Sequence, residues 1–146
     1  MKRAIQEAKL ASKRGDYAIG ACMVKNGKVI ASSGNRGKTK DDSTRHPELE
    51  LIQYVVGMHS GPYIEDCILY TTHEPCPMCS GACVWSNIGG VVYGNSISDF
   101  KTHTNIENRL KWRVIDIPCR KVLANTDTVV VGPYMQEECN KLFDVV

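Results

Sequence analysis

Two short stretches of this sequence bring together residue types that bind metals and move protons. His46-Pro47-Glu48 supplies an imidazole and a carboxylate, and Pro75-Cys76-Pro77-Met78-Cys79 supplies two thiols three positions apart. One imidazole and two thiols are three ligands for a tetrahedral zinc ion. Structural zinc sites take four protein ligands, whereas catalytic sites take three and leave the last position for water or substrate. The sequence therefore predicts a catalytic zinc site, with Glu48 facing the open position, and a hydrolytic reaction.

Both halves of this motif are expected at the start of a helix. Pro47 lacks an N–H donor and suits the first helical turn, and the apolar residues that follow it have helical spacing. Glu48 would lie in that first turn, where the helix dipole favours negative charge. Pro75 and Pro77 predict a second helix over about 76–86, whose free N–H groups would lower the pKa of the thiols. Strand-to-helix and loop-to-helix junctions of this kind are where α/β sheets usually place ligands.

The rest of the chain is predicted to alternate helices and strands, without a linker or an internal repeat. Further helices are expected over 2–14, near 120–124, and from Pro133 through 143. Strands are expected over 17–25, 28–33, 67–72, 90–94, 113–117 and 128–131, and 34–45 is expected to be a loop. Asn26-Gly27 between the first two strands predicts a type I′ hairpin. Helices between strands predict a parallel or mixed sheet covered on both faces.

The length of the chain suits a single domain over residues 1–146. The formal net charge is only +2, but the charge is unevenly distributed. Residues 1–45 hold eleven Lys and Arg against four Asp and Glu, whereas residues 122–146 hold one against four. A basic N-terminal region could attract phosphate or nucleic acid, but Asp41 and Asp42 interrupt it, which favours a solvated mixed surface.

Cysteine content indicates a reducing compartment. The seven cysteines are an odd number scattered over predicted strands and helices, which argues against a disulfide framework and favours the cytoplasm. The first sixteen residues contain no continuous apolar block, so neither a signal peptide nor a membrane span is expected.

The pattern H-x-E followed by P-C-x-x-C resembles the signature of the zinc-dependent cytidine and deoxycytidylate deaminase superfamily. The residues from Asp42 to His46 are similar to its D-x-T-x-H approach, Asn35 to its pocket asparagine, and 91–94 to the strand after its zinc helix. The similarity covers most of residues 1–95, and the tail resembles the family only loosely. It implies a three-layer α/β/α cytidine deaminase-like fold, with a mixed five-stranded central sheet that begins with an antiparallel hairpin, and a homodimer.

The resemblance also implies roles for individual residues. His46, Cys76 and Cys79 would hold Zn²⁺ in an enzyme that hydrolyses a cyclic amidine and releases ammonia. Glu48 would act first as general base and then as general acid. Asn35 would hydrogen-bond the heterocycle, and Phe100 is a weaker candidate for substrate binding by stacking on the base. Pro47 stands where alanine is commoner in the family, and activity is expected to survive that change.

A free nucleobase or nucleoside, such as guanine, cytosine or a related amino-heterocycle, is the predicted substrate. The segment 95–101 does not look like that of tRNA adenosine deaminases, and the acidic terminal helix lacks a basic face for tRNA. A tRNA-specific adenosine deaminase is the alternative, favoured by the basic residues Arg36, Lys38, Lys40 and Arg45. A third interpretation is a non-catalytic module that zinc stabilises.

Several residues have a second interpretation. Cys83, one helical turn after Cys79, is either a fourth ligand or a small buried thiol. Asn35 also suits a turn, and Glu48 also suits a helix cap. Glu50 is expected to face away from the metal, because two positions along a helix rotate a side chain by about 200°. We expect His59, His73 and His103 to lie at the surface or at the rim of the pocket. We expect Trp85 and Trp112 to lie in the core.

Overall fold

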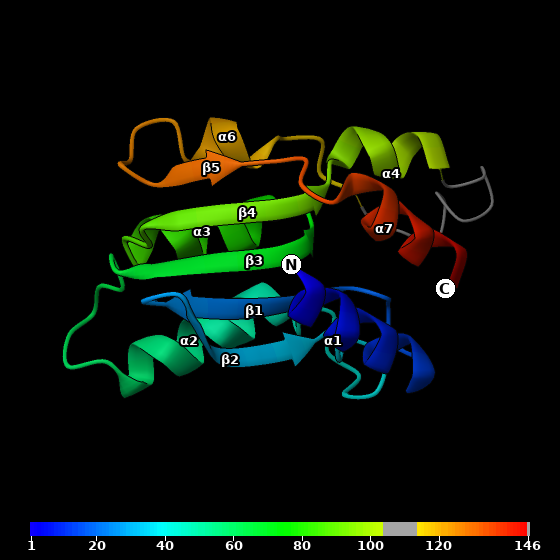
Figure 1. Ribbon diagram of the computed structural model, residues 1–146, viewed down its shortest axis with the longest axis horizontal. Coiled ribbons are helices and arrows are strands. Elements are labelled where there is room, and N and C mark those ends of the chain that lie inside the picture. Colours follow the sequence, from blue (N-terminus) through cyan, green and yellow to red (C-terminus); the bar gives the residue numbers. More distant parts are fainter. Residues whose placement is uncertain (104–113, 146) are drawn as a thin grey trace.

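The computed structural model describes residues 1–103 and 114–145, which form a five-stranded sheet flanked by helices (Figure 1). The strands are β1 (Gly20–Lys25), β2 (Lys28–Gly34), β3 (Cys67–His73), β4 (Gly90–Asn95) and β5 (Val129–Val131). The helices are α1 (Lys2–Lys13), α2 (Pro47–Met58), α3 (Pro77–Trp85), α4 (Ile97–His103), α6 (Cys119–Val122) and α7 (Gln136–Asn140), and a 3₁₀ turn follows over Lys141–Val145. No helix in these two ranges is both long and apolar enough to cross a bilayer.

The sheet is mixed and lies between two helical layers, as predicted. Its strand order is β2-β1-β3-β4-β5, with β1 antiparallel to both of its neighbours and β3, β4 and β5 parallel. Helices α2, α3 and α6 lie behind the sheet in Figure 1, and α1 and α7 lie in front of it. The carboxyl ends of β2, β3 and β4 point to the same edge of the sheet, the right-hand edge in this view. That edge is where the metal motif and the cavity lie.

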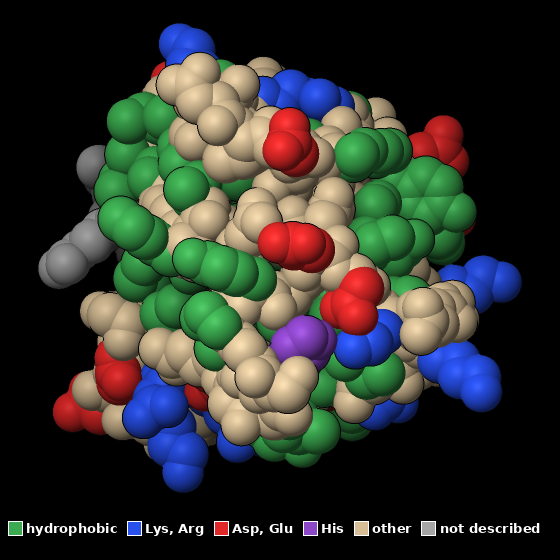
Figure 2. All heavy atoms as spheres, turned by 90° about the vertical axis from the view of Figure 1, so that its left-hand side faces the viewer, with side chains coloured by type: hydrophobic (Ala, Val, Ile, Leu, Met, Phe, Trp, Pro, Cys, Tyr) green, Lys and Arg blue, Asp and Glu red, His purple; other side chains and the backbone are tan. Residues whose placement is uncertain are grey.

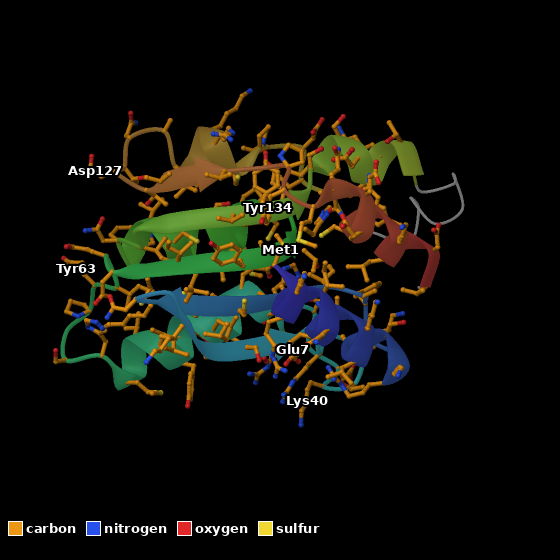
Figure 3. All side chains as sticks on the ribbon, in the orientation of Figure 1. Met1, Glu7, Lys40, Tyr63, Asp127 and Tyr134 are labelled. Atoms are coloured by element: carbon orange, nitrogen blue, oxygen red, sulfur yellow. The ribbon has the colours of Figure 1, made fainter. Side chains whose placement is uncertain are left out.

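Helix α1 approaches the sheet closely because two glycines face it. A Cβ atom on Gly20 would lie 2.2 Å from the backbone oxygen of Ala4, and one on Gly34 would lie 2.6 Å from that of Glu7. The alanines on this face of α1 are fully buried. The side chain of Glu7 reaches from α1 toward β2 (Figure 3), where it accepts a hydrogen bond from Ser32 Oγ at 2.8 Å.

Local sequence signals predicted most element boundaries within a few residues. Asn26 and Gly27 have positive φ angles of 51° and 73°, as the predicted type I′ hairpin requires. Pro47 and Pro77 each stand in the first turn of their helices. Gly15, with φ of 90°, follows the end of α1.

Three predicted elements were wrong in part. Residues 114–117 form no strand, because the sheet position next to β4 is taken by β5; Val114 and Ile115 instead line the cavity. The first strand begins at Gly20 and not at 17, because Tyr17 and Ile19 turn toward the same cavity. The terminal helix begins only at Gln136, after Met135 in the left-handed region (φ 54°).

One predicted core residue lies elsewhere. Trp85, at the end of α3, is 85% exposed and is not a core residue. Trp112 and residue 113 fall outside the residues that the structure describes.

The loop that joins β2 to α2 is fastened to the end of α1 by Asp16. This carboxylate is buried, and it accepts hydrogen bonds from the N–H groups of Lys38 (3.0 Å) and Thr39 (2.9 Å) and from Thr39 Oγ1 (2.8 Å). Burial raises the pKa of Asp16, but these hydrogen bonds and the nearby Arg14 outweigh it and lower the pKa below its ordinary value. Because the loop carries Asn35 at one end and reaches His46 at the other, Asp16 positions two residues of the site.

We expect Asp16→Asn to lower the free energy of unfolding at neutral pH by about 1–3 kcal/mol, because the amide has no charge to strengthen the hydrogen bonds at one oxygen and cannot accept the Thr39 hydroxyl at the other position. A lowered folded-state pKa stabilises the fold above the ordinary value of 3.8, and that stability is lost as pH falls through the folded value. Urea denaturation should therefore show that the difference in free energy of unfolding between wild type and Asp16→Asn becomes smaller at acid pH. A difference that stays constant from neutral pH to below 3.8 would contradict this account.

Candidate metal centre and cavity

The three predicted metal ligands converge although they come from two different helices. His46 immediately precedes α2, Cys76 immediately precedes α3, and Cys79 lies in the first turn of α3. Nδ1 of His46 lies 3.7 Å from Cys76 Sγ and 3.6 Å from Cys79 Sγ, and all three ligand atoms lie within 4.8 Å of one another. Zinc bonds of about 2.3 Å to sulfur and about 2.1 Å to nitrogen, at a tetrahedral angle, would separate N and S by about 3.6 Å. This donor set therefore fits a zinc ion.

The two thiols differ in acidity. Hydrogen bonds from the Cys79 thiol, from His46 and from the Cys79 N–H lower the pKa of Cys76 to about 4, although burial opposes them. The neighbouring Cys76 and burial raise the pKa of Cys79. Zinc binds thiolates, so a bound cation would supply the positive charge that the second thiolate requires.

Within the described part of the chain, this cluster contains three candidate ligands and no fourth His, Cys, Asp or Glu. Cys83 is fully buried in the main hydrophobic core, and burial raises the pKa of its thiol to about 12. Of its two predicted roles, the structure favours the buried thiol.

Glu48 lies beside the ligands in a buried position. Thr71 Oγ1 donates a hydrogen bond to Glu48 Oε1 at 2.5 Å, and Glu48 Oε2 lies 3.8 Å from Cys79 Sγ. Burial raises the pKa of Glu48, which is 3% exposed, against the opposing charge of His46 and the Thr71 hydrogen bond. Glu50 points elsewhere, as predicted, because it accepts a hydrogen bond from Ser33 Oγ at 3.0 Å and pairs with Arg45 at 3.7 Å.

A cavity of about 490 Å³ opens beside these residues, within the size range of small-molecule sites. Its described lining consists of Tyr17, Ile19, Asn35, Ser43, His46, Glu48, His73, Glu74, Cys76, Ile97, Phe100, Val114 and Ile115. Both predicted substrate contacts, Asn35 and Phe100, are in this lining. Asn35 also makes the predicted turn, because its Oδ1 accepts a hydrogen bond from the Gly37 N–H at 2.9 Å. Its Nδ2 makes no hydrogen bond to any residue in 1–103 or 114–145.

Sequence reasoning missed the part played by Glu74. This buried carboxylate accepts hydrogen bonds from the N–H groups of Ile97 (2.9 Å) and Cys119 (2.9 Å). It thereby joins the end of β3 to the starts of α4 and α6 and holds one wall of the cavity. In the sequence, the only available signal for this role was the position of Glu74 between the end of a predicted strand and Pro75.

The remaining histidines occupy different environments. His73, expected at the surface or pocket rim, lines the cavity, and burial lowers its pKa. His59 lies outside that lining, with Nε2 3.3 Å from Lys25 Nζ and 3.6 Å from Asp66. The side chain of His103 is outside the described residues.

None of the basic residues of the 36–45 loop belongs to the described lining of the cavity, although Lys38 lies next to the lining residue Tyr17. Arg45 pairs with Asp42 at 3.0 Å and, with Arg36, lines a second cavity beside β2 and α2. Lys38 Nζ lies 4.4 Å from the centre of the Tyr17 ring. Lys40 lies at the outer edge of the molecule (Figure 3). Among the residues described, no Lys or Arg lines the first cavity.

Comparison with known proteins places this site in a family. A model of the cytidine and deoxycytidylate deaminase zinc-binding region matches residues 1–95. The tRNA-specific adenosine deaminase of Bacillus subtilis is 43% identical over 94 residues, which cover 64% of this chain and only 58% of that relative. A probable cytosine deaminase of Schizosaccharomyces pombe is 33% identical over 141 residues, covering 94% of this chain and 84% of the relative.

A solved structure supports the same assignment. The guanine deaminase of Bacillus subtilis has a TM-score of 0.65 to this structure at 34% identity, covering 80% of this chain and 74% of that one. These relatives act on different substrates, so they do not select one for this chain. The matched residues 1–95 make up more than half of the chain and contain both halves of the His46, Cys76 and Cys79 motif. The protein therefore belongs to the cytidine and deoxycytidylate deaminase zinc-binding family.

Proposed function

We propose that this chain is a single-domain, zinc-dependent hydrolytic deaminase that removes an amine from a free nucleobase or nucleoside. The observation that carries the proposal is the convergence of three zinc-type ligands beside a buried carboxylate at the wall of a base-sized cavity. His46, Cys76 and Cys79 would hold the metal. When bound, zinc lowers the pKa of water toward neutrality and so supplies hydroxide at physiological pH.

Glu48 would carry the proton during the reaction. Its carboxylate is buried beside the candidate ligands, and Thr71 holds one carboxylate oxygen so that the other faces the ligand cluster. Glu48 would take a proton from the attacking water and deliver it to the ring nitrogen and then to the departing amine. Backbone N–H groups near the start of α3, other than that of Cys79, which donates to Cys76, would help to stabilise negative charge on the substrate.

A small neutral substrate agrees with the described lining of the cavity. Phosphates are bound mainly by Lys and Arg, and none of the described lining residues is a Lys or an Arg. Asn35 would bind a ring acceptor through its available Nδ2, and Phe100 would contribute an apolar wall. The seven free cysteines agree with a reducing cytoplasm.

Ammonia release from a panel of bases, nucleosides and nucleotides tests this function. The zinc-loaded protein should release ammonia from at least one free base or nucleoside, and the Glu48→Gln protein should release it about 10²–10⁴-fold more slowly. Release from tRNA alone would overturn the proposed substrate class.

A tRNA-specific adenosine deaminase is the second candidate, favoured by the 43% identity to the Bacillus subtilis protein of that name. Filter binding of tRNA at two salt concentrations separates the candidates. A tRNA enzyme that contacts 6–10 phosphates should lose about 10³-fold or more in affinity between about 50 and 200 mM salt. Weak binding with little salt dependence would favour the free base.

The exposed face of α2 and α3 suits a second copy of the chain. Tyr54 and Met58 on α2, and Met78 and Trp85 on α3, are exposed and apolar, and the two helices contact each other. Figure 2 shows hydrophobic side chains gathered on its left, the side on which these helices lie. Large exposed apolar patches usually mark interaction sites, and we propose that this one forms a homodimer.

Trp85→Glu is expected to convert such a dimer to monomer, because burying an unpaired charge in an apolar interface is strongly unfavourable. Light scattering during size exclusion measures the mass directly. Lys13→Glu, a charge change on α1 and far in sequence from this face, is the control and should leave the mass unchanged. A wild-type monomer, or a Trp85→Glu dimer of undiminished stability, would contradict the assignment.

A further inference from the structure

His73 faces the cavity, and the metal motif assigns it no role. It ends β3, pairs in register with Asn95 on β4, and lines the same cavity as Glu48 and Asn35. An imidazole can either donate or accept a hydrogen bond, depending on which nitrogen carries the hydrogen. The neighbours of His73 determine which nitrogen this is.

Asn95 fixes the hydrogen of His73 on Nδ1. Asn95 is buried, and its Nδ2 donates a hydrogen bond to the backbone oxygen of Cys139 at 3.2 Å. This orientation leaves Asn95 Oδ1, which can only accept, facing Nδ1 of His73, and the two atoms are hydrogen-bonded. Nδ1 must therefore be the donor. Burial also lowers the pKa of His73, which favours the neutral ring with a lone pair on Nε2.

Two aromatic rings hold the imidazole in this orientation. Phe100 and Phe143 lie edge-on to His73, at centroid distances of 5.7 Å and 6.0 Å, and 5.6 Å from each other. Rotation of the ring would break both the Asn95 hydrogen bond and these contacts. Nε2 of His73 makes no hydrogen bond to any residue in 1–103 or 114–145. It is also not one of the buried side-chain atoms in these ranges that lack a hydrogen-bond partner. The lone pair is available to a ligand in the cavity.

We propose that Nε2 of His73 accepts a hydrogen bond from the substrate and so selects amino-heterocycles that carry an N–H group besides the departing amine. This inference rests on the proposed function and narrows its substrate class. Guanine, with its ring N–H groups, and free cytosine belong to the class. Adenosine and cytidine do not, because every ring nitrogen of their bases is either an acceptor or bound to ribose. Asn35 Nδ2 supplies a hydrogen-bond donor in the same cavity. Asn35 and His73 would therefore together bind one acceptor and one donor of the substrate.

Nitrogen-15 NMR of histidine-labelled, zinc-loaded Glu48→Gln protein tests the proposal without turnover. Long-range proton–nitrogen spectra distinguish protonated from bare ring nitrogens. We expect His73 to have hydrogen on Nδ1 and none on Nε2. Saturating guanine or cytosine should shift the Nε2 signal toward the protonated range, and adenosine should leave it unchanged.

Two substitutions test specificity in the protein with Glu48 intact. His73→Leu should weaken binding of bases with a ring N–H by about tenfold, the worth of one hydrogen bond, and should leave adenosine binding unchanged. His73→Gln keeps an acceptor oxygen at similar reach and should recover part of the loss. Zinc content and thermal unfolding verify that both variants are folded.

The outcomes separate this inference from the proposed function. Hydrogen on Nε2 of His73, or equal losses for all bases in His73→Leu, overturns the inference and leaves deaminase activity untouched. An Nε2 shift with guanine in a protein that releases no ammonia from any base overturns the proposed function and retains the binding role. A protein that binds no base at all refutes both.

Discussion

Replacing Glu48 with glutamine is expected to lower kcat by about 10²–10⁴-fold, the usual worth of a positioned general acid–base group, without loss of zinc. Glutamine keeps the shape of the side chain and can still accept the hydrogen bond from Thr71, but it cannot carry a proton. Because Glu48 is buried beside the ligands and is not part of the three-ligand cluster, metal content should stay at the wild-type level.

Glu50→Gln is the matched control. Glu50 lies in the same first turn of α2 but contacts Ser33 and Arg45, outside the described lining of the cavity. Its turnover should stay near wild type. Comparable activity in Glu48→Gln and wild type would mean that the chain is a zinc-stabilised module without this chemistry, or that another group carries the proton.

Cys79→Ser is expected to abolish turnover and to reduce zinc affinity by more than about 100-fold. Loss of a residue that only hydrogen-bonds a metal ligand typically costs about 10–100-fold, and loss of a ligand itself should cost more. Serine is a poor ligand for zinc because its hydroxyl is not ionised at neutral pH, so the site would keep only His46 and Cys76. Competition with a chromogenic chelator measures the affinity.

Cys83→Ala is the control for that substitution, because Cys83 lies one turn further along α3 in the hydrophobic core. Its zinc affinity should match wild type while its stability falls modestly through loss of buried volume. If Cys83→Ala released zinc and Cys79→Ser did not, the assignment of ligands would be reversed.

Local chemistry explains which features the sequence could predict. Asn26-Gly27 defines a hairpin because few other pairs adopt two positive φ angles, and prolines at 47 and 77 define helix starts because they lack an N–H. The convergence of His46, Cys76 and Cys79 could be predicted because metal chemistry restricts both the types and the number of ligands. Each of these signals lies within a few neighbouring residues.

Features that depend on distant parts of the chain escaped prediction. The carboxylate of Glu74 is bound by N–H groups 23 and 45 residues away. The apolar run from Val114 to Ile117 has strand-like composition, but the place beside β4 is occupied by β5. His73 acquires its orientation from Asn95 and from Phe143 near the other end of the chain. None of these partners is identifiable from local periodicity.

X-ray absorption at the zinc edge of the metal-loaded protein tests the central claim most directly, because it counts sulfur neighbours without reference to a substrate. Two sulfur neighbours at about 2.3 Å, with the remaining positions filled by nitrogen or oxygen at about 2.0–2.1 Å, are the predicted result. A third or fourth sulfur neighbour would mean that the open position is closed by protein, and the hydrolytic function proposed for this site would be contradicted.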